Sequence, residues 1–137
     1  MTFEGRVWKD GKHWLIEAPD LAVMTQGHSR KDAYAMMKDL VETMADRPDF
    51  EATVEPVGDD RVEIGSNDIR VLLALFLRRQ RERHGVSLTQ AAERLAQRSR
   101  NAYARYERGE VVPSVEKLEE LLRAVAPEAR LVWRLAS

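Results

Sequence analysis

The sequence contains no cysteine, and this absence excludes disulfide bonds, thiolate metal ligands and thiol nucleophiles. It also has no run of about 18 consecutive apolar residues, which excludes a membrane-spanning helix. Residues 1–4 lack the basic and apolar stretches of a secretory signal, so we expect a cytoplasmic location. The 137 residues, 44% of them hydrophobic and 33% charged, suffice for one medium domain or two small ones with buried cores.

The net charge of −1 conceals an uneven distribution along the chain. Residues 1–66 carry 8 Lys/Arg against 14 Asp/Glu, whereas residues 67–137 carry 14 Lys/Arg against 9 Asp/Glu, so the halves have formal charges of −6 and +5. Residues 67–108 alone hold 10 arginines and 4 acids. An acidic half followed by a basic half predicts two modules with different partners, and the basic half suits a polyanion. The alternative is that the arginines only solvate helix surfaces.

The first half has the pattern of a small sheet with one helix. Strands are predicted at residues 3–8, 13–18, 22–26, 52–57 and 61–64. Asp10 and Gly11 form a dipeptide typical of hairpin turns, and Ser29 can cap a helix whose apolar residues recur at helical spacing. These residues are Ala33, Met37, Leu40, Val41 and Met44. The order β-β-β-α-β(β) predicts an α+β fold with the helix packed on one face of an antiparallel sheet.

The second half has the pattern of a helical domain with a C-terminal strand. Ser87 and Gln90 have the spacing of a capping box, and residues 131–135 are sufficiently β-branched and aromatic for a strand. The predicted helices run from Asp68 to Gly85, from Ser87, from Ser99 to Gly109, and from Pro113-Ser114 to Pro127. We therefore expect one domain at residues 1–65 and a second, all-α domain at residues 66–137.

Two short helices joined tightly within a helical bundle are the arrangement of a protein that reads the DNA major groove. In the third helix, Tyr103, Tyr106 and Glu107 share one side, which we expect to be buried. The other side carries arginine and asparagine, which bond bases and phosphates, around a small residue that permits close approach. Residues 87 and 89 lie at a helix N-terminus, where N–H groups favour phosphate. The candidate DNA contacts are Ser87, Thr89, Arg98, Arg100, Asn101, Ala104, Arg105 and Arg108.

Each of these residues also has a purely structural alternative. Gln90 can serve as a capping partner only, and Arg105 and Arg108 can pair with Glu107 or Glu110 on a solvated surface. The joint pattern favours DNA binding more strongly than any single member does.

Four stretches of the second half match a known pattern, and they lie between residues 70 and 126. They are residues 77–87, residues 92–95, Tyr106-Glu107-Arg108-Gly109, and Pro113-Ser114. In this order they resemble the Xre-type helix-turn-helix family, in which the pattern implies operator binding as a dimer. Two departures are visible, because Leu88 stands where the family usually has glutamine, and the turn at residues 96–98 is one residue longer than usual.

Three short motifs characterise the first half, and a helix-turn-helix follows them. They are Pro19-Asp20-Leu21, Thr25-Gln26-Gly27, and Ser29 with a helix that begins Lys31-Asp32-Ala33. This order resembles the HicB antitoxin family, whose domains are similar to a truncated ribonuclease H fold. The resemblance implies an antitoxin that neutralises a HicA-like mRNA-cleaving toxin by direct binding and represses its own operon.

An acidic first domain suits a basic RNA-binding toxin, because opposite charges speed the encounter and stabilise the complex. Packing on the sheet is the alternative role for the two tryptophans among the candidate contacts. These candidates are Trp8, Trp14, Asp20, Glu51 and Glu55, with Asp59 and Asp60 as further acidic residues.

We expect neither catalysis nor a bound cofactor or metal. The available carboxylates, Glu17, Asp20 and Glu51, show no pairing in the sequence that would suit a metal-dependent nuclease. The histidines are scattered without zinc-binding spacing, and they are His13, His28 and His84. Two alternative functions remain open, namely a stand-alone regulator whose first domain binds a small ligand, and a nuclease with its own DNA-targeting module.

Ile69 and residues 71–77 are apolar around the whole helix, whereas a surface helix keeps one polar face. One side of this helix is expected in its own bundle, and the other against a second subunit, the first domain or the C-terminal segment. We predict a dimer through the second domain, which would read a two-fold related operator. The candidate dimer contacts are Leu73, Phe76, Leu77, Leu131 and Trp133.

Overall fold

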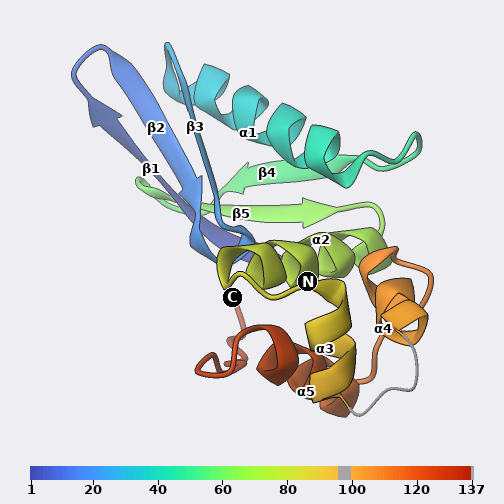
Figure 1. The fold of residues 1–137 in the computed structure, drawn as a ribbon. Coiled ribbons are helices and arrows are strands. Elements are labelled where there is room, and N and C mark those ends of the chain that lie inside the picture. Colours follow the sequence, from blue (N-terminus) through green and yellow to red (C-terminus); the bar gives the residue numbers. More distant parts are fainter. Residues whose placement is uncertain (96–99, 137) are drawn as a thin grey trace.

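The computed structural model describes residues 1–95 and 100–136, except for the side chain of Arg100. Its first half is a five-stranded antiparallel sheet in the order β3-β2-β1-β5-β4, with helix α1 along one face (Figure 1). The elements are β1 (Phe3–Asp10), β2 (His13–Ala18), the 3₁₀ turn η1 (Pro19–Leu21), β3 (Val23–Gly27), α1 (Arg30–Ala45), β4 (Ala52–Pro56) and β5 (Arg61–Ser66). The predicted α+β class is confirmed.

Alternation along the strands defines an inner and an outer face of the sheet. In β1, Phe3 and Val7 are buried on the inner face, whereas Trp8 is exposed on the outer face. Helix α1 contributes the buried Ala33 to the inner side, and it approaches β3 so closely that only glycine fits at Gly27. A Cβ atom at that glycine would lie 2.4 Å from the backbone nitrogen of Ala33. The sheet and α1 therefore form two tightly packed layers.

The second half consists of four helices, and each predicted cap that the structure describes is present. The helices are α2 (Ile69–Arg83), α3 (Leu88–Arg94), α4 (Arg100–Glu107) and α5 (Val115–Val125). The side chains of Asp68, Ser87 and Ser114 accept hydrogen bonds at the N-termini of α2, α3 and α5. Gly85 and Gly109 have φ angles of +66° and +68°, which only glycine adopts without strain, so they permit the turns after α2 and α4.

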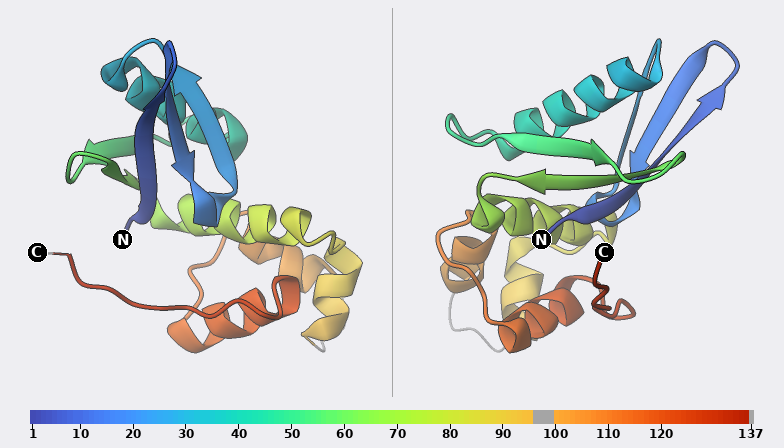
Figure 2. Two further views of the ribbon diagram at one scale, coloured as in Figure 1. Left: turned by 90° about the vertical axis from the view of Figure 1, so that its left-hand side faces the viewer. Right: turned by 180° about the vertical axis from the view of Figure 1, so that it is seen from behind.

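Helix α2 is buried on both sides because it lies between the sheet layer and the other helices (Figure 2). Phe76 packs on Phe3 of β1 with ring centroids 5.2 Å apart. Leu73, Phe76 and Leu77 are 6%, 6% and 1% exposed within a single chain. Of the three partners considered for the second apolar side of this helix, the structure therefore shows the first domain. These side chains pack within the chain and leave almost no surface for a second subunit.

Polar contacts also join α2 to the sheet domain. The carbonyl oxygens of four consecutive residues, 19–22, accept hydrogen bonds from its last turns. Arg79 donates to the carbonyls of Leu21 and Ala22 at 3.3 and 2.7 Å. Gln80 donates to the carbonyl of Asp20 at 2.7 Å, and Arg83 donates to that of Pro19 at 3.2 Å. Gln80 is only 7% exposed, so its amide is satisfied where water has little access. These bonds tie the turn η1 to the helical half.

The C-terminal segment differs from its prediction. Residues 126–136 form neither a helix nor a strand, and no backbone–backbone hydrogen bond joins residues 131–136 to the rest of the described chain. The β-branched and aromatic residues here have no neighbouring strand to pair with in a single chain, since the nearest strand, β1, is already paired on both sides with β2 and β5. The predicted terminal strand is thus absent, and strand propensity alone does not create one.

Candidate nucleic-acid interface

A buried hydrogen-bond network sets the orientation of α4. Glu107 accepts from Arg81 of α2 at both oxygens, with Nε to Oε1 at 2.6 Å and Nη2 to Oε2 at 3.2 Å. The hydroxyl of Tyr103, one turn earlier on α4, donates to the same Oε1 at 2.8 Å. Arg81 also donates to the carbonyl of Val86 at 2.9 Å, just before α3. One guanidinium therefore holds α2, the start of α3, and α4 together.

The burial of this network agrees with the predicted inner side of α4. Tyr103 is fully buried, and the side chains of Arg81 and Glu107 are only 15% and 7% exposed. Burial, together with the charge and the hydrogen bond of Glu107, raises the pKa of the Tyr103 hydroxyl above its ordinary value. Burial alone would lower the pKa of Arg81, but the hydrogen bond and charge of Glu107 raise it. The phenol is thus neutral and the arginine charged at any physiological pH.

The opposite side of α4 is exposed and positively charged. Asn101, Arg105 and Arg108 are all exposed there. Both arginines pair with Glu110 in the following loop, at 3.1 Å from Arg105 and 2.9 Å from Arg108. These hydrogen bonds hold the pKa of the Glu110 carboxyl below its ordinary value. The surface pairing proposed as an alternative therefore exists, and it involves Glu110, because Glu107 is bound by Arg81.

Such exposed ion pairs stabilise a protein by only about 0–1 kcal/mol, so they compete weakly with a phosphate. Two cations that share one carboxylate keep a net positive charge. The arrangement can therefore hold both guanidinium groups ready on the surface and release them to a nucleic acid backbone.

Ala104 does not lie on the exposed side, which corrects its prediction. It is 9% exposed and follows the buried Tyr103 by about 100° around the helix. That step brings it to the side of α4 that packs against α2 and α3. The expected small residue at the centre of the exposed face is therefore part of the core, and the exposed face consists of longer side chains.

The remaining candidate DNA contacts lie around α3 and the start of α4. Ser87 and Thr89 are both exposed at the N-terminus of α3. The Ser87 hydroxyl accepts from the Gln90 backbone nitrogen at 3.0 Å, and the Gln90 amide oxygen accepts from the Ser87 nitrogen at 2.9 Å. This is the capping box that the sequence predicts, and it is the structural alternative considered for Gln90. Arg98, the predicted cap Ser99 and the side chain of Arg100 lie outside the described residues.

Two arginines that sequence reasoning did not select support these helices through bonds to backbone carbonyls. A guanidinium nitrogen of Arg47, after α1, donates to the carbonyl of Arg108, and Arg94 donates to the carbonyl of Ala124 at 2.9 Å. Cations at helix C-termini interact favourably with the helix dipole. Arg81, Arg47 and Arg94 are positioning residues of the interface, and their partners are far away in sequence or are backbone atoms, so no local pattern identifies them.

The candidate toxin contacts are spread over several parts of the sheet domain. Trp8 and Glu55 lie on the outer face of the sheet, and both side chains are exposed, Trp8 by 38%. Trp14 lies on the inner side instead, half-buried under the guanidinium of Arg30 at 4.6 Å, and it packs against the core as its alternative role predicted. The other acidic candidates are exposed on turns and loops, namely Asp20, Glu51, Asp59 and Asp60.

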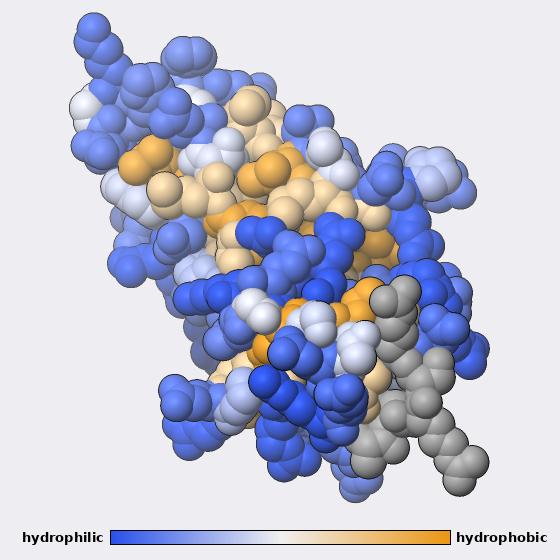
Figure 3. Space-filling model, viewed as in Figure 1, coloured by the Kyte–Doolittle hydropathy of each residue, from blue (hydrophilic) through white to orange (hydrophobic). Residues whose placement is uncertain are grey.

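The outer face also brings together acidic residues that the sequence pattern does not link. Strand register places Glu63 of β5 directly between Glu4 of β1 and Glu55 of β4. Like charges directly opposite one another on a sheet are destabilising, and Arg61, 4.0 Å from Glu4, offsets this row only in part. We name the row of Glu4, Glu63 and Glu55 the acidic row. In the space-filling view, apolar colour gathers around α1, whereas the helical half is mainly hydrophilic (Figure 3).

Comparison with known families bears on the helical half. Residues 72–130 match the family model described as a helix-turn-helix domain. The match spans most of α2 and the whole of α3, α4 and α5, so the C-terminal part is a helix-turn-helix domain. This supports DNA binding and a role in transcription regulation. No curated protein matches the chain significantly.

Two further findings concern the described residues. No group of three or more His, Asp or Glu residues among them is placed to hold a metal ion. None of the described helices combines the length and the apolar character that crossing a membrane requires.

Proposed function

We propose that the protein is a non-catalytic antitoxin of the HicB type, which binds and neutralises a HicA-like mRNA-cleaving toxin and represses its own operon. In this proposal residues 1–65 bind the toxin and residues 66–137 bind operator DNA. The observation that carries it is the exposed cationic side of α4, held outward by Arg81 and Glu107, on the same chain as the acidic row of the outer sheet face.

The DNA-binding part rests on Asn101, Arg105 and Arg108. All three side chains are exposed on one side of α4 while Tyr103 anchors the other side in the core. Asparagine bonds adenine with two hydrogen bonds, and arginine bonds guanine or phosphate. A helix with this division of its two sides is suited to lie in the major groove.

The test is a gel shift with the DNA upstream of the protein's own reading frame. The double variant Asn101→Ala/Arg105→Ala is expected to lose affinity by about 30-fold or more, because each base contact contributes about 1–3 kcal/mol. Arg123→Ala, on the exposed side of α5, removes an equal charge away from α4 and is the matched control. Retention by the double variant, with a normal helical circular dichroism spectrum, would contradict the assignment of α4 as the recognition helix.

The toxin-binding part is supported by the acidic row and by Trp8. A basic RNA-binding protein meets opposite charge there, with an aromatic side chain farther along the same face as an anchor. We expect co-expression with the small basic protein from a neighbouring reading frame to yield a stable complex. Glu55→Lys/Glu63→Lys should release that partner, whereas Glu116→Lys/Glu119→Lys, two exposed sites on α5, should not. If neither double variant releases the partner, the outer face is excluded as the toxin site.

A stand-alone regulator that binds a small ligand is the second candidate, and one observation favours it. A groove of about 1020 Å³ lies between the sheet domain and the helices, which is in the size range of small-molecule sites. Growth rescue separates the two functions, because an antitoxin restores growth to cells that express the toxin, whereas a ligand-dependent regulator does not. Cleavage of RNA by the purified chain with a divalent cation would instead identify a nuclease.

A further inference from the structure

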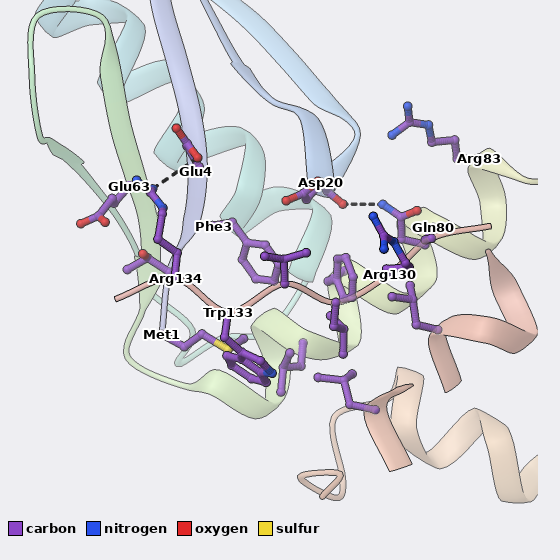
Figure 4. A pocket seen from close by; sticks show the side chains of 18 of the residues that line it. Met1, Phe3, Glu4, Asp20, Glu63, Gln80, Arg83, Arg130, Trp133 and Arg134 are labelled. Atoms are coloured by element: carbon purple, nitrogen blue, oxygen red, sulfur yellow. Dashed lines mark hydrogen bonds and ion pairs between the residues drawn. The ribbon is translucent and has the colours of Figure 1, made fainter. Parts of the chain in front are cut away.

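A second, smaller cavity of about 250 Å³ lies on the outer face of the sheet. It is lined by Arg6, Val7 and Trp8 of β1, by Glu17 of β2, and by Asp60 in the loop before β5. It shares no lining residue with the larger groove shown in Figure 4. Small-molecule sites usually occupy about 300–1,000 Å³, so this cavity suits a single side chain better than a whole ligand.

Strand register places the side chains of this cavity. Arg6 stands directly opposite Glu17, so Trp8, two residues further along β1, is the diagonal neighbour of Glu17. Diagonal neighbours on adjacent antiparallel strands lie about 7–8 Å apart, within reach of an aromatic side chain. On the other side of β1, the backbone nitrogen of Val7 donates to the carbonyl of Asp60 at 3.0 Å, which holds that loop against the strand. Two carboxylates therefore flank this part of β1.

Only one of these two carboxylates has a partner within the described chain. The Arg6 guanidinium pairs with Asp60 at 3.8 Å, although Arg6 stands opposite Glu17 in the register. No described residue pairs with the half-buried carboxylate of Glu17. The ring of Trp8 is 38% exposed, and no cation of the described residues lies over it. The cavity therefore offers an unpaired carboxylate and an open aromatic ring side by side.

We propose that this cavity binds an arginine side chain of the basic partner protein, with the guanidinium against the ring of Trp8 and paired with Glu17. The proposal rests on the proposed toxin-binding function and deepens it, since it names the chemical group that the outer face recognises. A guanidinium is planar and weakly hydrated, so it can stack on an aromatic ring while it donates two parallel hydrogen bonds to a carboxylate. A neutral side chain would make neither of these charge-dependent contacts.

The cavity is a better anchor for a partner cation than the acidic row is. In that row, Glu4 is already paired within the chain, with Arg61 at 4.0 Å and with Arg134 at 3.3 Å, the second pair being marked by a dashed line in Figure 4. A partner cation at Glu4 has to compete with these arginines, whereas at Glu17 it displaces none. The charge of the row therefore acts mainly by attracting the partner, and the cavity fixes where its arginine binds.

The first experiment requires no partner protein. The full chain, labelled with ¹⁵N, is titrated with N-acetylarginine amide, and N-acetylcitrulline amide is the matched probe, because it has nearly the same shape without the charge. We expect the indole N–H resonance of Trp8 to shift with the arginine probe at millimolar concentrations and much less with the citrulline probe. An equal response of Trp8 to the two probes would overturn the proposal.

The two other tryptophans are internal controls in this titration. Trp14 is half-buried on the inner side, under the guanidinium of Arg30. In the C-terminal segment, Leu131 packs partly buried against the core, whereas Trp133 is 61% exposed. Figure 4 shows Trp133 beside Met1 and away from the carboxylate of Glu4. Exposure alone therefore predicts that Trp133 responds most strongly, whereas the proposed cavity predicts that Trp8 does.

Three variants test the charges of the cavity. Glu17→Gln keeps the shape of the side chain without its charge, and it should abolish the difference between the two probes. Asp39→Asn, at an exposed site of α1 on the other side of the sheet, removes an equal charge and should leave that difference unchanged. Arg6→Gln removes the chain's own cation from the cavity wall, so the response should increase. A Trp8 response that survives Glu17→Gln would contradict the assignment of this carboxylate.

The second experiment measures the affinity for the small basic protein from the neighbouring reading frame. Trp8→Leu/Glu17→Gln should weaken that complex about tenfold, since it removes a cation–π contact and an ion pair together. The two proposals fail separately. If no complex forms, the toxin-binding function fails, and the probe titration still decides whether the cavity binds a guanidinium. A complex whose affinity the double variant leaves unchanged would refute the cavity as its anchor and leave the toxin-binding function standing.

Discussion

The network of Arg81, Glu107 and Tyr103 makes the strongest prediction about how the recognition helix is held. Glu107→Gln keeps the shape of the side chain but removes its charge. The Arg81 guanidinium, 15% exposed, would then retain a carbonyl and an amide as partners but lose the carboxylate that compensates its charge. Removal of one partner from a buried ion pair costs about 3–5 kcal/mol. We expect about 3 kcal/mol, because some solvent reaches Arg81 and its bond to Val86 remains.

The two other members of the network give graded expectations. Tyr103→Phe loses one hydrogen bond to a charged acceptor, which contributes about 1.5–3 kcal/mol. Glu107 still binds Arg81 in that variant, so the lower end of this range applies. The double variant Arg81→Met/Glu107→Leu removes both charges and fills similar volume, and it should be more stable than Glu107→Gln alone. We therefore expect the free energy of unfolding to decrease in the order wild type, Tyr103→Phe, double variant, Glu107→Gln. The value for the double variant should lie close to those of the two single variants on either side of it in this order.

Urea unfolding followed by circular dichroism measures these differences, and a gel shift at a temperature where all variants are folded measures the effect on DNA. For a chain of this length a loss of 3 kcal/mol lowers the thermal midpoint by about 10 °C. The double variant should recover stability but not DNA affinity, because apolar side chains do not fix the rotation of α4 about its axis. A Glu107→Gln chain as stable as the wild type would refute the assignment of a buried, structural ion pair.

Other predictions concern separate parts of the chain. Glu110→Gln frees Arg105 and Arg108, so DNA affinity in a gel shift should rise severalfold at low salt, and a fall would show that Glu110 orients them. Arg105→Ala should reduce the slope of log K against log salt by about 1 if this arginine contacts a phosphate. The raised pKa of Tyr103 means that the unfolded state ionises first, so stability should fall as pH rises above about 10, and Tyr103→Phe should flatten that dependence in urea titrations. Gly27→Ala places a methyl group against the backbone of α1, and thermal unfolding should show a loss of more than 2 kcal/mol.

The elements of this fold could be predicted because their signals are local. Ser29, Asp68 and Ser114 each cap a helix within three residues of their own position, and the capping box of Ser87 depends on one residue three positions ahead. A local signal needs no knowledge of what packs against the element. The same reasoning failed at residues 131–135, where strand propensity depends on a neighbouring strand that a single chain does not supply.

The candidate site was predicted less completely because its geometry depends on distant contacts. Tyr103 was expected inside, and its burial is confirmed, but Ala104 was expected outside and lies in the core. The two positions lie about 100° apart around the helix, so the buried side of α4 is wider than the prediction assumed. What sets the rotation of α4 is Arg81, which is 26 residues away from Glu107. A helical wheel drawn for α4 alone contains no information about this partner.

The arginine content of residues 67–108 has a different meaning once the contacts are known. Arg79 and Arg83 donate to carbonyl oxygens of the η1 turn, and Arg94 to one of α5, so their positions serve the packing of the chain. Bonds to neutral carbonyls leave the positive charges of Arg83 and Arg94 in place, whereas Glu82 pairs with Arg79 at 3.1 Å and Glu107 pairs with Arg81 at 2.6 Å. The helical half therefore keeps a positive field that attracts DNA from a distance, while the exposed side chains of α4 are placed to determine where it binds. Charge counting thus identifies the class of partner, and the hydrogen-bond geometry identifies the surface that meets it.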